Sequence, residues 1–262
     1  MAGVDRLGRA LRSAEQDRRS LLVVYLTHAP ADCRPVELAL AAVEAGADVL
    51  ELGLPTPSAA PRGEEIRDSF RRAAATTTEE AWDVLGRLRE ALPDTPLLPL
   101  IYPETSDDLG WRPLLDGAAS AGADGVVLTR PWHDGGLERV AASGLSAVPV
   151  LPATASPAEV TRAEAGAQHL TYRALADRTG GRVDLDSARA LAEELGRTAT
   201  KPFLVGFGIS EAEEIEALAP HAAGVVVGSA AIRAVRSAAP GARVRALSTA
   251  VRAWKNAAHI RR

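Results

Sequence analysis

Glu51 is the residue of this sequence whose position suggests chemistry most directly. It lies near the end of the apolar run "DVLELGL" and precedes the loop "PTPSAAPRG", in which Arg62 is the only charged residue. A carboxyl group at the end of a buried strand can act as a general acid or base when its surroundings raise its pKa. It can also be a solvated or ion-paired residue at the rim of a barrel. The position of Glu51 alone leaves both interpretations open.

Two glycine turns predict a binding site for an anion. The segments "VGFGIS" and "VVVGSAAI" each pass from an apolar run to a helical pattern through glycine. Glycine lets the backbone approach a ligand closely, and the free N–H groups at a helix start favour negative charge. We expect Gly208, Gly228 and Ser229 to bind phosphate, with Gly180 of the segment "TGG" as a further candidate. The alternative is that these glycines only form tight turns.

The elements that must position these residues alternate regularly along the chain. Apolar runs span residues 21–26, 48–54, 96–102, 124–129, 147–153, 169–175, 202–208 and 223–229. Amphipathic stretches separate them, and "EAGAD" and "SAGADG" place glycine where a helix ends. Eight such units predict an α/β protein with a (β/α)₈ TIM barrel. We expect one domain over residues 1–262, with an N-terminal helix over 2–18 closing the barrel bottom. A doubly wound sheet would need a glycine-rich first turn, which "YLTHAPADC" lacks.

The barrel prediction restricts where a site can lie. Active sites of TIM barrels form at the C-terminal ends of the strands. The candidates at those ends are Tyr25, Thr27, Glu51, Tyr102, Arg130 and Tyr172. The tyrosines could bind a substrate or only pack. His28 and His133 have no second ligand at metal spacing, so we expect neither a metal nor a cofactor.

Composition excludes several classes of partner. The 262 residues are 47% hydrophobic and carry a formal net charge of −4, so neither nucleic acid nor an anionic membrane is expected as a partner. Cys33 is the only cysteine, which excludes an intrachain disulfide. The charged start of the chain lacks the apolar core of a secretion signal, and no run has the roughly 18 apolar residues of a membrane helix. We therefore expect a cytoplasmic protein.

The sequence resembles the tryptophan synthase α subunit family, the indole-3-glycerol-phosphate lyase barrel. The segments that carry the resemblance are "EAGADVLELGLP", "LIY", "AGADGVVL", "LTY", "GFGIS" and "AAGVVVGSAAI". They occur in the family's order over nearly the whole chain. The resemblance implies retro-aldol cleavage to indole and glyceraldehyde 3-phosphate, with Glu51 as proton shuttle and Tyr172 beside the scissile bond. It also implies that Tyr25, Leu100 and Tyr102 line the indole pocket.

The departures from the family lie mostly in the loop after Glu51. The family usually reads "PFSDPLADGP" there, and its second catalytic carboxylate, which receives the indole N–H, aligns with Arg62. Another loop aspartate aligns with Ser58, and a third family aspartate aligns with Arg130. Guanidinium offers only hydrogen-bond donors and would hold a neighbouring Glu51 ionised. The expectation is therefore weak or absent cleavage of indole-3-glycerol phosphate. Because the resemblance implies that the same loop helps an α subunit communicate with its β partner, a complex with a tryptophan synthase β subunit is also doubtful.

Three functions follow from this pattern of matches and departures. The first is a related lyase for a phosphorylated small molecule, with Arg62 or Arg130 binding a second anionic group such as a carboxylate. The second is a non-catalytic phosphate-binding paralogue that acts as a binding or partner protein. The third keeps the indole-3-glycerol-phosphate lyase, with another acid replacing the lost aspartate.

Overall fold

Eight parallel strands form a closed barrel, as the alternating pattern predicts. The computed structural model describes residues 5–27, 34–56, 58–59, 61, 63–129, 132, 135–175 and 184–259. The strands are β1 (Leu21–Thr27), β2 (Val49–Gly53), β3 (Leu97–Ile101), β4 (Gly125–Leu128), β5 (Ser146–Leu151), β6 (Thr171–Ala174), β7 (Phe203–Gly206) and β8 (Gly224–Val227). Each strand pairs with its neighbour in sequence, and β8 pairs with β1 to close the barrel. The ends of the expected strands differ from these by at most two residues.

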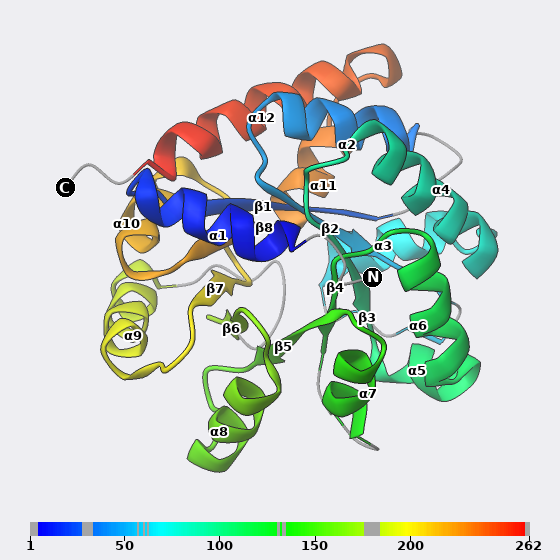
Figure 1. Ribbon diagram of the computed structural model, residues 1–262. Coiled ribbons are helices and arrows are strands. Elements are labelled where there is room, and N and C mark those ends of the chain that lie inside the picture. Colours follow the sequence, from blue (N-terminus) through cyan, green and yellow to red (C-terminus); the bar gives the residue numbers. More distant parts are fainter. Residues whose placement is uncertain are drawn as a thin grey trace.

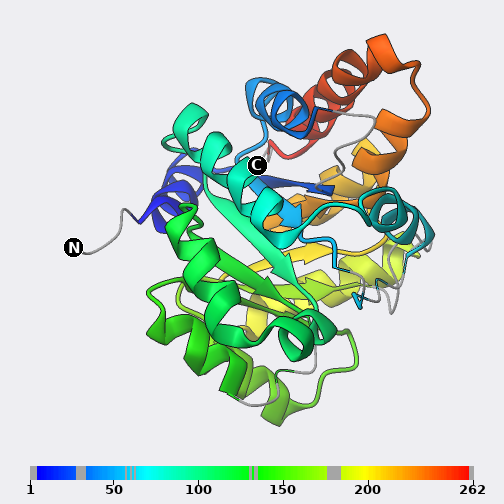
Figure 2. The same cartoon turned by 90° about the vertical axis from the view of Figure 1, so that its right-hand side faces the viewer.

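Helices surround the barrel on its outside (Figures 1 and 2). They are α1 (Arg6–Gln16), α2 (Pro35–Glu44), α3 (Glu64–Arg72), α4 (Thr78–Ala91), α5 (Pro103–Leu109), α6 (Trp111–Ser120), α7 (Gly136–Ala142), α8 (Pro157–Gly166), α9 (Leu185–Thr198), α10 (Ala212–Leu218), α11 (Ser229–Arg236) and α12 (Arg243–Ala257). Two glycines that end helices, Gly46 and Gly122, have φ angles of 116° and 88°. These angles favour glycine, which explains its place before β2 and β4.

Strand residues alternate between the barrel interior and the layer under the helices. On β1, Leu21 and Val23 belong to the interior cluster, whereas Leu22 and Val24 belong to the cluster that packs against helices. This two-residue period is the geometry of a strand covered on both faces. Leu7 and Ala14 of α1 join the interior cluster. The N-terminal helix therefore closes the barrel bottom, as expected.

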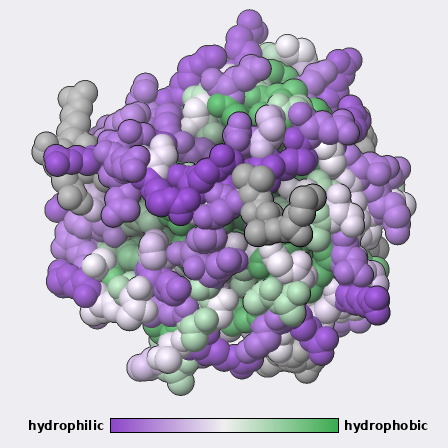
Figure 3. Space-filling view, viewed as in Figure 1, coloured by the Kyte–Doolittle hydropathy of each residue, from purple (hydrophilic) through white to green (hydrophobic). Residues whose placement is uncertain are grey.

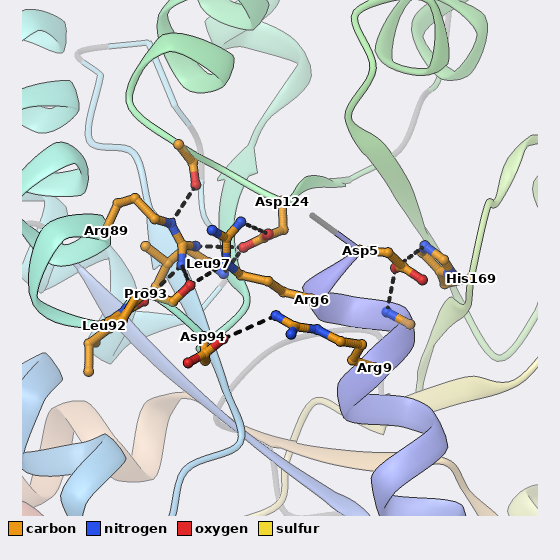
Figure 4. Close-up of polar contacts among 12 residues, drawn as sticks. Asp5, Arg6, Arg9, Arg89, Leu92, Pro93, Asp94, Leu97, Asp124 and His169 are labelled. Carbon is orange, nitrogen blue, oxygen red and sulfur yellow. Dashed lines mark hydrogen bonds and ion pairs between the residues drawn. The ribbon is translucent and has the colours of Figure 1, made fainter. Parts of the chain in front are cut away.

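Two ion-paired aspartates connect strands to helices and loops at the bottom of the barrel. Asp124, just before β4, accepts hydrogen bonds from Leu97 N at 2.8 Å, Arg89 at 2.6 Å and Arg6 at 3.1 Å (Figure 4). Asp48, just before β2, repeats this arrangement with the backbone N–H of Leu22 at 2.8 Å and with two basic side chains. Each aspartate thus joins the N-terminal end of a neighbouring strand to basic side chains from helices or loops. The sequence motif "GAD" is explained by this repeated structural role.

The outer surface is mainly polar. On the face in Figure 3, hydrophilic side chains cover most of the area and hydrophobic ones form smaller patches between them. Among the described residues, Leu109 and Val244 are the large hydrophobic side chains that are exposed. No described helix is both long enough and apolar enough to cross a membrane.

Candidate active site

Strand β2 places Glu51 inside the barrel, near its C-terminal end. Its neighbours Leu50 and Leu52 pack outward against helices, while Val49 belongs to the interior cluster, so Glu51 faces inward. Glu51 is 3% exposed and lies beside Tyr25 of β1 and Leu98 of β3 in the sheet register. The interpretation of Glu51 as a solvated rim residue is therefore wrong.

The Glu51 carboxyl group has an unusual electrostatic environment. Its Oε2 atom is buried and has no hydrogen-bond partner among the residues that the structure describes. Burial raises the pKa of Glu51 from 4.5 to about 8, because the charged form loses hydration without receiving a compensating bond. At neutral pH the protonated form predominates. Such a group can donate a proton to a substrate, which is the requirement for a general acid.

Three tyrosines surround this carboxyl group. Burial raises the pKa of Tyr25, Tyr102 and Tyr172, and the charge of Glu51 raises each of them further. Tyr172 packs against Phe207, with 5.4 Å between ring centroids, and Tyr102 meets the edge of Phe70 at 5.8 Å. The candidates at the ends of β1, β2, β3 and β6 are therefore brought together. The result is an aromatic, poorly hydrated lining around Glu51.

Two glycines make room for the tyrosine hydroxyl groups. A Cβ atom on Gly53 would lie 2.0 Å from the Tyr25 hydroxyl oxygen, and one on Gly206 would lie 2.3 Å from that of Tyr172. No real Cβ atom approaches another atom so closely, so a side chain at either position must displace a tyrosine. The glycines of "ELGLP" and "VGFG" thus have a packing role at the candidate site.

A chain of hydroxyl groups fixes the direction of the Tyr25 hydrogen bond. Ser69 on α3 donates to the Ile66 carbonyl oxygen at 2.7 Å, and Thr27 lies 2.7 Å from Ser69 and 3.0 Å from the Tyr25 hydroxyl. A carbonyl only accepts and each hydroxyl has one proton. Ser69 must therefore accept from Thr27, and Thr27 from Tyr25. The lone pairs of Tyr25 remain free to accept from a further donor.

The expected phosphate-binding turns lie at the adjacent ends of β7 and β8. Gly208 has φ 98° and follows Phe207, which also has positive φ at 71°. A phenylalanine in this region is strained, and such strain is typical of functional sites. Gly228 precedes α11, and the Ser229 hydroxyl oxygen at the start of that helix is buried without a partner in the described part of the chain. A ligand oxygen near this helix start could supply the missing partner.

Helix α3 connects the loop after Glu51 to α11, the helix that follows the glycine turn at Gly228. Ile66 and Phe70 of α3 form a buried cluster with Ile232 of α11 and with Tyr25, and Ala59 of the loop packs against it. Ion pairs Arg233–Glu65 at 2.9 Å and Arg236–Asp68 at 3.0 Å join the same two helices. Because the side chains of these arginines are 41% and 46% exposed, the apolar cluster contributes most of the stabilisation.

The structure describes some of the remaining predicted site residues and not others. Leu100 is buried in the interior cluster together with Tyr172, and its place in an indole pocket stays a prediction. Arg62, Arg130 and Gly180 lie outside the described residues, as do His28, His133 and Cys33. Sequence reasoning missed the site residues Ser69, Phe70 and Phe207. Ser69 and Phe70 are in the helical segment "EEIRDSFRR", whose pattern gives no sign of contact with a strand end.

Comparisons with known proteins agree with the resemblance. A family model described as tryptophan synthase alpha chain matches residues 11–259. The curated tryptophan synthase alpha chain of Halorhodospira halophila is 31% identical over 240 residues, which cover 88% of each chain. That of Corynebacterium glutamicum is 30% identical over 209 residues, covering 76% of this chain and 75% of the relative.

Solved structures agree on the fold. Tryptophan synthase subunit alpha from Legionella pneumophila has a TM-score of 0.84 at 24% identity, covering 97% of this chain and 98% of that chain. A structure from Aquifex aeolicus has a TM-score of 0.86 at 22% identity, covering 98% of this chain and all of that chain. The extent of the family match and the identity to curated relatives show that this chain belongs to the tryptophan synthase alpha chain family.

Proposed function

We propose that this protein is a carbon–carbon lyase that cleaves indole-3-glycerol phosphate to indole and glyceraldehyde 3-phosphate. The observation that carries the proposal is the buried, unpaired Glu51 at the mouth of the barrel, whose pKa is raised to about 8. Membership of the tryptophan synthase alpha chain family supports the same reaction. An acid that is protonated at neutral pH is what the departure of an indole carbon requires.

One carboxyl group can supply the proton transfers of this cleavage. Protonated Glu51 donates its proton to the ring carbon of the scissile bond, which makes the ring a cationic leaving group. The resulting Glu51 carboxylate accepts the proton of the neighbouring hydroxyl as the carbon–carbon bond breaks and the aldehyde forms. Glu51 ends the cycle protonated, and the reaction consumes and releases no net proton. The lining tyrosines, Tyr25, Tyr102 and Tyr172, exclude water and hold the ring.

The phosphate of the substrate would bind at the turns that follow β7 and β8. Gly208 and Gly228 keep the backbone accessible there, and Ser229 has a buried hydroxyl oxygen that lacks a partner among the described residues. Addition of glycerol 3-phosphate should therefore raise the melting temperature. A Ser229→Ala variant should show a smaller shift in melting temperature. Ser143→Ala, on a turn after α7, should show the same shift as the wild type.

The expectation of weak cleavage had two grounds: Arg62 would keep Glu51 ionised, and it would not accept the indole N–H. The burial of Glu51 and its raised pKa support the acid form instead. Family membership likewise supports a tryptophan synthase beta chain as partner more strongly than the sequence pattern did. We propose in addition that residues 1–262 form one domain and that the protein works in the cytoplasm. The closed barrel and the packing of α12 on α2 and α11 support a single domain.

Indole release from indole-3-glycerol phosphate tests the proposal directly. The wild-type chain should release indole, alone or with a tryptophan synthase beta chain, and Glu51→Gln should lower kcat by about 10²–10⁴-fold. Glu90→Gln on the exposed side of α4 is the matched control and should leave turnover unchanged. If the wild type releases no indole with or without a beta chain, the proposal is wrong.

A second candidate is a lyase of the same type for a substrate with an additional anionic group. It is favoured by Ser58 and Arg62, which stand where the family has aspartates. Arginine binds carboxylates through paired donors. Replacing Arg62 by Asp would then impair the acidic substrate and improve indole-3-glycerol phosphate cleavage. A barrel that is stabilised by glycerol 3-phosphate but cleaves neither substrate would instead be the non-catalytic paralogue.

A further inference from the structure

Glu104 is a second carboxyl group at the mouth of the barrel. It follows Tyr102 at the end of β3, the strand that pairs with the Glu51 strand β2. After burial, the charges of Glu51 and then Glu104 raise the pKa of Tyr102. Both carboxyl groups are therefore within electrostatic range of one phenol. Neither periodicity nor motif identified Glu104, because it reads as an ordinary first-turn acid of the short helix α5.

One oxygen of the Glu104 side chain, Oε2, is buried and lacks a hydrogen-bond partner in the described part of the chain. A carboxylate oxygen without a donor loses hydration and gains nothing from the fold. An acid that served only the start of α5 would instead direct its oxygens to backbone N–H groups. The unpaired oxygen therefore indicates a donor that comes from a ligand.

The loop that follows Glu51 is anchored beside this carboxyl group. Ser58 donates a hydrogen bond to the Glu104 carbonyl oxygen at 3.3 Å, and the hydroxyl groups of Thr56 and Thr105 lie 2.8 Å apart. These contacts hold the backbone of Glu104 at the edge of the aromatic lining formed by Tyr102 and Phe70. A flat apolar ring in this lining would bring an N–H group at its edge toward a free acceptor.

We propose that Glu104 is the second carboxylate of the site and accepts a hydrogen bond from the ring N–H of the substrate. This inference rests on the proposed function for the identity of the ring. When the protonated ring becomes cationic, its N–H becomes a stronger donor, and a carboxylate partner stabilises that charge. Glu51 and Glu104 then have separate tasks: Glu51 carries the proton and Glu104 stabilises the charge that the proton creates.

Equilibrium binding tests the inference without requiring turnover. Two non-cleavable probes differ only at the ring: indole-3-propanol phosphate has the N–H, and its benzofuran counterpart has an oxygen there. The wild type should bind the indole probe roughly 10- to 100-fold more tightly, the range of a hydrogen bond to a charged group. Glu104→Met removes the acceptor and should reduce that preference to within about threefold. Glu104→Gln, which keeps the shape and an amide oxygen, should retain part of it.

Asp107→Asn is the matched control, because Asp107 is an exposed acid on the same helix. It should leave the preference for the indole probe unchanged. In the indole-release assay, Glu104→Gln should lower kcat by roughly 10²-fold with a smaller change in KM.

The outcomes separate this inference from the proposed function. If the wild type does not cleave the substrate but prefers the indole probe through Glu104, the proposed function fails and the inference stands. If the wild type cleaves the substrate while the Glu104 variants keep both kcat and the preference, the inference is wrong. Binding of both probes without preference in the wild type, or of neither, also overturns it.

Discussion

Two buried carboxyl groups at opposite ends of the barrel have opposite environments. Asp124 at the bottom accepts hydrogen bonds from Arg89, Arg6 and the backbone N–H of Leu97. Glu51 at the mouth is as well buried, yet its Oε2 atom has no partner among the described residues. The fold could evidently pair a buried acid, as it does before β2 and β4. A buried acid without a hydrogen-bond partner lowers the stability of the fold, and such acids are typical of sites that transfer protons.

The pH dependence of stability should reveal the cost at Glu51. Because folding raises its pKa from 4.5 to about 8, the unfolded chain releases this proton first as the pH rises. For this group stability is therefore greatest below about pH 4.5 and falls by roughly 4 kcal/mol as the pH rises to 8. Glu51→Gln should remove this loss, so the variant should melt at a higher temperature than wild type at pH 8. The difference should shrink to about 1 kcal/mol near pH 5.

Thermal unfolding of Glu51→Gln, Glu90→Gln and wild type between pH 5 and 8 measures this effect. Glu90→Gln should follow the wild type, because that glutamate is exposed. Parallel curves for wild type and Glu51→Gln at all pH values would mean that Glu51 is not a destabilised acid.

The opposite result is expected at the barrel bottom. Asp124→Asn removes the charge that pairs with two arginines and should destabilise the fold by about 2–3 kcal/mol, a value reduced by the partial exposure of those arginines. Chemical denaturation measures the loss. Asp116→Asn, an exposed acid on α6, should change stability by less than about 0.5 kcal/mol. An unchanged or stabilised Asp124→Asn would remove the contrast between the two ends.

Gly53→Ala tests how tightly the mouth is packed. Its Cβ would meet the Tyr25 hydroxyl, so we expect a loss of roughly 1–3 kcal/mol and weaker ligand binding. Gly86→Ala on α4 meets no atom within 4 Å and should stabilise the helix by about 0.5–1 kcal/mol. Denaturation curves for both variants give the comparison. Equal effects at the two positions would contradict the packing role of Gly53.

Tyr25→Phe should have the smallest effect. It removes the donor to Thr27 but leaves the Thr27–Ser69 bond, so the expected loss is about 0.5–1.5 kcal/mol. Thr198→Val, which removes an exposed hydroxyl bond at the end of α9, is a control with a comparable loss of one bond. A loss well above this range would show that the hydroxyl chain acts as one cooperative unit.

The barrel could be predicted from the sequence because its strands are short apolar runs with a regular spacing. The place of Glu51 near the end of a strand could be predicted, but its inward orientation and its protonation could not, since both depend on packing with residues from β1, β3 and β6. The shared role of Asp48 and Asp124 at the barrel bottom could not be predicted from the sequence either, although both stand in the same short motif. Their partners, such as Lys255 and Arg6, are distant in sequence.

The environment of Glu104 could not be predicted from the sequence either. In the sequence it is a polar residue after a proline at a helix start, a position where acids are common. Its buried, unpaired oxygen becomes visible only when the loop from β2 is placed beside α5. Whether an acid can serve in a site therefore depends on the hydrogen-bond donors around it, which only the folded structure shows.

The titration of Glu51 itself shows whether this carboxyl group is protonated at neutral pH. Carbon-13 NMR of the glutamate carboxyl groups, with Glu51→Gln identifying the resonance, gives the midpoint in the folded protein. We expect a midpoint near 8, far above the ordinary value of 4.5. A midpoint near 4.5 would mean that Glu51 is ionised at neutral pH, and the assignment of Glu51 as the acid of this site would be wrong.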